Sequence, residues 1–233
     1  MNKPQIKSKK RVEDHGEVFT NEREVNAMLD LVKDESFNIE STFLEPACGD
    51  GNFLEVILKR KLSSVKNKYS KYLPDYEKYC IVAVSSIYGV DILEDNVEAC
   101  INRLHSVFCS EYDSVCKKNA NGRIKAVALY ILRKNILCGD ALTLLKSDKT
   151  PIVFAEWKMV SGSKIKRRDF TMSKILEAES YNTQLADDGG DQLSLFGTLD
   201  EDIKKEIYDS VNKPIKEYPL TNYWELDKYE WKL

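Results

Sequence analysis

The chain has 233 residues, a formal net charge of −3 and an isoelectric point near 5.6, with 42% hydrophobic and 31% charged residues. These values fit one globular domain with a tail or small lobe, and they exclude a protein whose affinity for DNA comes from overall charge. No run of about 18 apolar residues occurs and the lysine-rich N-terminus has no apolar core, so neither a membrane span nor a secretory signal is predicted.

Short apolar runs alternate with amphipathic stretches along most of the chain. Apolar residues recur every three or four positions, which predicts helices, at residues 21–32, 52–62, 76–86, 96–115 and 126–132. Strands are predicted at the apolar runs 42–44, 87–90, 135–138 and 151–157. This alternation predicts an α/β protein with a doubly wound parallel sheet, in which a ligand binds beyond the carboxyl ends of the strands.

The composition divides the chain into three parts. Residues 1–15 are predicted to form a basic arm, 16–180 the sheet domain, and 181–233 an acidic flexible segment and tail. The six cysteines form no Cys-x-x-Cys pair and lie in apolar or helical stretches. They are therefore predicted to be reduced core residues of a cytoplasmic protein, without a metal site.

The sharpest local feature is a glycine-rich turn between the first predicted strand and the helix after it. Gly49 and Gly51 permit a tight turn there, and the free amides at the start of the helix can bind an anionic group. Asp91 closes the second predicted strand, where a carboxylate can accept the hydroxyls of a ribose, and Asp140 closes the third. Each aspartate alone could equally be a helix cap or turn residue, but three such strand ends in order favour a cofactor site.

Four segments together resemble the N6-adenine DNA methyltransferases of restriction–modification type. The segment Glu45-Pro46-Ala47-Cys48-Gly49-Asp50-Gly51 is similar to their cofactor motif, and residues 15–20 (HGEVFT) are similar to the segment before it. Residues 87–92 and 135–142 are similar to the next two motifs, so the resemblance covers about residues 11 to 170. It implies a Rossmann-like fold that binds S-adenosylmethionine.

The resemblance also implies roles for particular residues. Phe19 and Thr20 would contact the methionine part of the cofactor, and Asp91 with Ile92 would hold its ribose and adenine. The remaining implied cofactor residues would shape the pocket or bind the adenine amino group: Glu45, Ala47, Gly49, Gly51, Asp140 and Ala141. The alternative roles are a core aromatic for Phe19 and a turn partner for Glu45.

The catalytic tetrapeptide of that family, Asn/Asp-Pro-Pro-Tyr/Phe, does not occur, and the chain contains no Pro-Pro pair. In the family this loop binds the amino group of an adenine that has been flipped out of the duplex. The segment Phe154-Ala155-Glu156-Trp157 lacks the prolines, so Trp157 is predicted to be a packing residue and the catalytic residues stay unknown. The sequence thus predicts a cofactor-binding half that methylates DNA together with a partner subunit. The alternatives are a catalytically silent S-adenosylmethionine-binding protein and a decayed reading frame.

A short apolar motif stands in the acidic tail. Gln192, Leu193, Leu195 and Phe196 resemble the pentapeptide by which bacterial proteins bind the replication sliding clamp. An extended segment can place such apolar side chains into pockets of a partner. The alternative is a hydrophobic latch on the protein's own domain.

Overall fold

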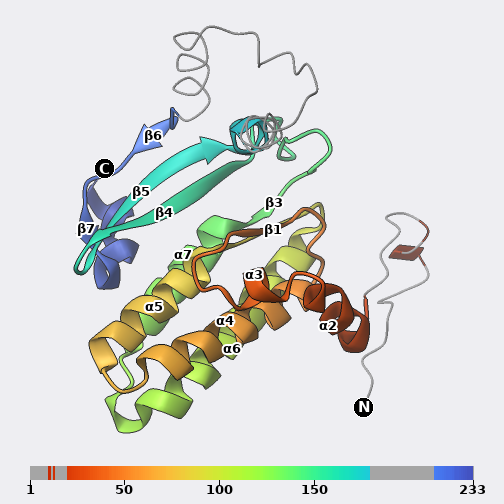
Figure 1. The fold of residues 1–233 in the computed structure, drawn as a ribbon. Helices are drawn as coiled ribbons and strands as arrows, with labels where there is room; N and C mark the ends of the chain where they lie inside the picture. Colours follow the sequence, from red (N-terminus) through yellow and green to blue (C-terminus); the bar gives the residue numbers. More distant parts are fainter. Residues whose placement is uncertain (1–9, 12, 14–19, 179–212, 233) are drawn as a thin grey trace, which may run out of the picture.

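The computed structural model describes residues 10, 11, 13, 20–178 and 213–232 (Figure 1). The helices are α2 (Glu22–Asp30), α3 (Lys33–Phe37), α4 (Asn52–Tyr69), α5 (Leu73–Ser85), α6 (Glu94–Cys116), α7 (Gly122–Asn135), and the 3-10 helices η1 (Lys117–Asn119) and η2 (Tyr223–Lys232). The strands are β1 (Phe43–Glu45), β2 (Ile87–Asp91), β3 (Ile136–Cys138), β4 (Val153–Ser161), β5 (Lys164–Thr171), β6 (Lys216–Glu217) and β7 (Thr221–Asn222).

The first three strands form a parallel sheet in the order β1-β2-β3, which confirms the α/β class. The four long helices α4 to α7 lie on one side of this sheet, and the β4–β5 hairpin lies on the other (Figure 1). Crossovers between parallel strands are right-handed, so strands that succeed one another in one direction place their connecting helices on the same face. In the described residues the order does not reverse, and reversal is the feature that makes a sheet doubly wound.

Two of the helices begin at an asparagine that caps them. The Asn21 side chain accepts the amides of Arg23 and Glu24 at the start of α2, and Asn121 caps α7 in the same way. All five predicted helices are confirmed, although α4 and α7 extend beyond the predicted ends. The short helix α3 was not predicted, because five residues carry too little periodicity to be recognised.

The prediction that residues 151–157 form a fourth strand of the parallel sheet is wrong. The strand β4 exists, but it pairs antiparallel with β5 in a hairpin that turns at Gly162, whose φ of +55° suits a tight turn. Its outer half is exposed on alternate residues, a pattern typical of antiparallel strands rather than of buried parallel ones.

The central strand β2 contributes to two cores. Ile87 packs among the helices, and Gly89 faces them too, with Leu54 so close that an added Cβ would lie 3.0 Å from it. Tyr88 and Val90 point to the other face, where they pack against Ile152, Phe154 and Met172. Both faces of the sheet are therefore covered by the chain itself.

The end of the chain returns to this domain. Strands β6 and β7 extend the hairpin through pairing with β5, and Tyr223 and Leu226 are buried beside α7. Arg123 donates to the carbonyl of Trp224 across 2.7 Å. The six cysteines are free thiols, four of them buried. Among the described residues no helix is both long enough and apolar enough to cross a bilayer.

Candidate functional site

The carboxyl ends of the three parallel strands meet at Asp91. The amide of Gly49, in the glycine turn after β1, donates to Asp91 Oδ2 across 2.9 Å, and the amide of Gly139, after β3, donates to the Asp91 carbonyl across 3.0 Å. The Cys48 amide also donates to the carbonyl of Val90, across 2.8 Å. The predicted convergence of the strand ends is present, with the end of β2 in the middle.

The glycine turn has the left-handed backbone that its sequence predicts. Gly49 has a φ of +52° and Gly51 a φ of +90°, and Gly51 forms the N-cap of α4. A Cβ on Gly51 would lie only 2.8 Å from the buried sulfur of Cys100 on α6. The glycine at 51 is therefore required by packing against α6 as well as by the turn.

We expect Gly51→Ala to lower the free energy of unfolding by about 2–4 kcal/mol, because it adds backbone strain and a clash. Gly162→Ala is the matched control, since Gly162 also has a positive φ but an added Cβ meets nothing within 4 Å. It should cost only about 1–2 kcal/mol in denaturant unfolding. Adding Cys100→Ala to Gly51→Ala should recover part of the loss, and equal costs for the two glycine variants would contradict the clash.

An arginine on α6 holds the turn in place. Arg103 is hydrogen-bonded to the side chains of Asp50 and Asn52, the residues on either side of Gly51. The Asn52 amide in turn donates to the carbonyl of Thr20 across 3.3 Å. Thr20, which the resemblance assigned to the methionine end, thus lies beside the glycine turn.

The Asp91 carboxylate is already engaged by the chain. Besides Gly49, it accepts the Leu93 amide at 2.9 Å and the side chain of Asn96 at 3.2 Å, both on Oδ1. A carboxylate offers about four acceptor positions, so about one is left for a ligand hydroxyl. The fully buried side chain of Asn96 also accepts a hydrogen bond from the Arg11 guanidinium. The same guanidinium donates to both carboxylate oxygens of Asp95. Arg11, which belongs to the predicted basic arm, therefore contacts the domain.

The third strand end is a local turn. Asp140 accepts from the Leu142 amide at 2.9 Å and from the Thr143 hydroxyl at 3.0 Å, and these bonds lower the pKa of its carboxyl. Ala141 packs partly against the Tyr88–Phe154 core. Ile92 is 58% exposed at the end of β2 and could cover an apolar ring there.

Glu45 closes β1 and is half-buried. Burial raises the pKa of its carboxyl above the ordinary value, which the hydrogen bond from the Ala47 backbone partly offsets. Ala47 itself is exposed in the turn. Phe19 and the motif Gln192, Leu193, Leu195 and Phe196 lie outside the described residues.

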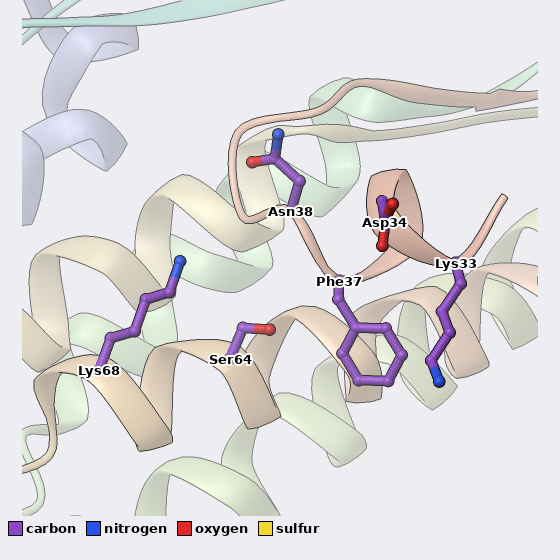
Figure 2. Close-up of a pocket in the computed structure, with 6 residues that line it drawn as sticks. All are labelled: Lys33, Asp34, Phe37, Asn38, Ser64 and Lys68. Atoms are coloured by element: carbon purple, nitrogen blue, oxygen red, sulfur yellow. The ribbon is translucent and has the colours of Figure 1, made fainter.

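Two hollows lie near these elements. One of about 220 Å³ runs beside β1 and includes Glu45 in its lining. The other, of about 560 Å³, lies between α3 and α4 and contains none of the predicted site residues. Figure 2 shows that its two lysines, Lys33 and Lys68, point in different directions. The guanidinium carbon of Arg60 lies over the Phe37 ring, 5.3 Å from the ring centroid. Only the first hollow touches the strand ends.

The sequence analysis missed the residues that hold the site together. Asn96 and Arg103 lie on α6, and neither has a sequence signal, because their partners are 5 and about 50 residues away. The segment Phe154-Ala155-Glu156-Trp157 is structural: Trp157 is buried and donates to Asn135 across 2.9 Å, while Glu156 pairs with Arg168. The packing role predicted for Trp157 is confirmed.

These features define an α/β protein with a three-stranded parallel sheet and a candidate ligand site at the carboxyl ends of its strands. The chain matches no family model, no curated protein and no solved structure.

Proposed function

We propose that the chain is the S-adenosylmethionine-binding part of a DNA adenine-N6 methyltransferase that works with a partner subunit. The observation that carries this proposal is the meeting of a glycine turn and two further strand ends at Asp91, within hydrogen-bond distance. Parallel α/β sheets bind nucleotide-like ligands at the carboxyl ends of their strands. The resemblance of four motifs to restriction–modification methyltransferases is the reason for proposing S-adenosylmethionine as that ligand.

Each cofactor group has a candidate contact. One ribose hydroxyl would use the acceptor position left on Asp91, and the adenine would lie on Ile92 with its amino group toward Asp140. The amino acid part would lie along the turn, between Gly49 and Glu45. Thr20 and Phe19 would cover it from the N-terminal side.

Catalysis and DNA recognition would come from the partner. The residues after β3 form a hairpin in which Phe154 and Trp157 are buried, so this segment cannot stack on a flipped base. The free thiols fit a cytoplasmic protein.

Calorimetry with S-adenosylmethionine is the direct test. We expect saturable binding to the purified chain, and methyl transfer to DNA only when a partner bearing the Pro-Pro-Tyr loop is added. Absence of binding at millimolar cofactor would refute the proposal.

One observation favours a second function: in the segment Phe154-Ala155-Glu156-Trp157, which follows the third parallel strand, both aromatic side chains are buried in the core. A silent S-adenosylmethionine-binding protein would bind the cofactor equally well. It would not support methyl transfer with any partner, which separates the two functions.

The tail motif adds the sliding clamp as a docking partner to either proposed function. Purified sliding clamp should retain the wild-type chain in a pull-down, and the double variant Leu195→Ala/Phe196→Ala should not be retained. Equal retention of the wild type and the variant would contradict this docking.

A further inference from the structure

The strand β1 is an open edge of the parallel sheet. It pairs with β2 on one side, where the amide of Phe43 donates to the Ser86 carbonyl across 2.9 Å. Successive residues of a strand direct their backbone groups to opposite edges, so those of Leu44 point away from β2. In the part of the chain that the structure describes, no strand pairs with this edge. Such an edge is a template for another strand.

The open edge lies beside the 220 Å³ hollow, which is mainly apolar. Its lining comes from α2, β1 and α4: Met28, Leu29, Phe43, Leu44, Glu45, Phe53, Leu54 and Ile57. Met28 is 54% exposed although it belongs to this lining. Glu45 is the one charged residue in it, at the carboxyl end of β1. A strand with apolar side chains toward the hollow and a hydrogen-bond donor or cation near its end complements this surface.

The sheet topology gives the direction of the missing strand. The order β1-β2-β3 corresponds to one half of a doubly wound sheet, and in such sheets the other half begins with a strand that is parallel to the first strand and next to it. The chain's own next strand, β4, is used in the hairpin instead.

We propose that the open edge of β1 and the hollow beside it are the docking surface for the partner subunit, which adds a parallel strand next to Leu44. This inference rests on the proposed function. The carboxyl end of the added strand lies next to Glu45 and Gly49, at the point where strand order reverses and ligands bind in such sheets. The loop after that strand therefore reaches the cofactor site, which is where a catalytic loop is needed.

Hydrogen exchange of the full chain alone tests whether the edge is free. The Leu44 amide should exchange much faster than the amides of Phe43 and Glu45, which face β2. Protection of Leu44 at all protein concentrations would mean that the chain's own residues cover the edge, and protection that grows with concentration would mean a second copy. Either result overturns the proposal.

A designed peptide supplies the partner strand. The probe has an alternating apolar strand followed by Asn-Pro-Pro-Tyr, and binding at up to millimolar peptide is followed by amide NMR shifts. The shifted amides should centre on β1 and α2, and bound peptide should protect the Leu44 amide from hydrogen exchange. Met28→Asp, in the hollow, should weaken peptide binding by at least about tenfold. Leu31→Asp is the control, because Leu31 follows α2, is 86% exposed and lies outside the hollow. This control should change peptide affinity by less than about twofold.

No shifts, shifts at β3, or equal effects of the two variants would overturn the docking surface. Calorimetry with S-adenosylmethionine on the same samples keeps the two proposals apart. Cofactor binding without peptide binding removes only the docking surface, and absence of cofactor binding removes the proposed function.

Discussion

Lys61→Met is expected to destabilise the fold by about 2–4 kcal/mol at high pH. The destabilisation shrinks as the pH falls, and near pH 7 the variant should be as stable as the wild type or more stable. Lys61 lies on α4 and is fully buried. Its ammonium group donates to the carbonyls of Asn38, at 3.0 Å, and Ser41, and to the Ser86 hydroxyl at 2.8 Å. Methionine fills the space but leaves these buried acceptors without their donor.

The pH dependence follows from the cost of burying the charge. Burial lowers the pKa of Lys61 from 10.5 to about 7. Below about pH 7 both folded and unfolded chains carry the charge, and the folded state bears the whole cost. Between about 7 and 10 the unfolded chain binds more protons, so the Lys61 contribution to stability rises with pH, by up to roughly 4–5 kcal/mol.

Denaturant unfolding of both proteins across this pH range measures the effect. Burial also raises the pKa values of the thiols of Cys80, Cys109, Cys116 and Cys138, which lowers stability above about pH 8.5 in both proteins. The difference between the two proteins cancels this contribution. Lys59→Met, on the same helix but half-exposed and paired with Glu55, should change stability by less than about 1 kcal/mol. A difference between wild type and Lys61→Met that does not vary with pH would contradict the lowered pKa.

Asp91→Asn should weaken S-adenosylmethionine binding by about tenfold to a hundredfold and lower the free energy of unfolding by about 1–3 kcal/mol. The amide is nearly the same size as the carboxylate. It has one acceptor oxygen, however, for three donors of the chain and for the ribose hydroxyl. If its nitrogen takes the place of Oδ2, it faces the Gly49 amide as a second donor.

Calorimetry and thermal unfolding on the same variant separate the two effects. Asp95→Asn is the matched control, because Asp95 lies four residues further on, is exposed and pairs with Arg11. It should leave cofactor affinity within about twofold, since exposed ion pairs contribute little. Loss of stability in Asp91→Asn without loss of cofactor affinity would leave Asp91 as a structural hub and remove its ribose contact.

The predicted elements agree with the fold wherever a local signal decides the structure. The stripe of apolar residues in α6 and the Asn21 cap of α2 are local, because each depends on neighbours within one or two turns. The glycine turn is local too, since the left-handed backbone at Gly49 and Gly51 needs residues without a Cβ. The pairing of residues 151–157 could not be predicted from nearby residues, because an apolar run is compatible with a parallel strand and with a hairpin. The tight turn at Gly162 reverses the chain, and β4 therefore pairs antiparallel with β5.

By itself the sequence determined the α/β class, the order of the first three strands along the chain, and the polar residues at their ends. Burial patterns and glycine turns depend on residues that are close in the sequence. Only the tertiary structure decided that Asp91 is held by Gly49, Leu93 and Asn96, that Lys61 is enclosed by carbonyls, and that β1 has an open edge. Those features depend on which distant segments meet, and the meeting is governed by the packing of whole helices against the sheet rather than by any short stretch of the chain.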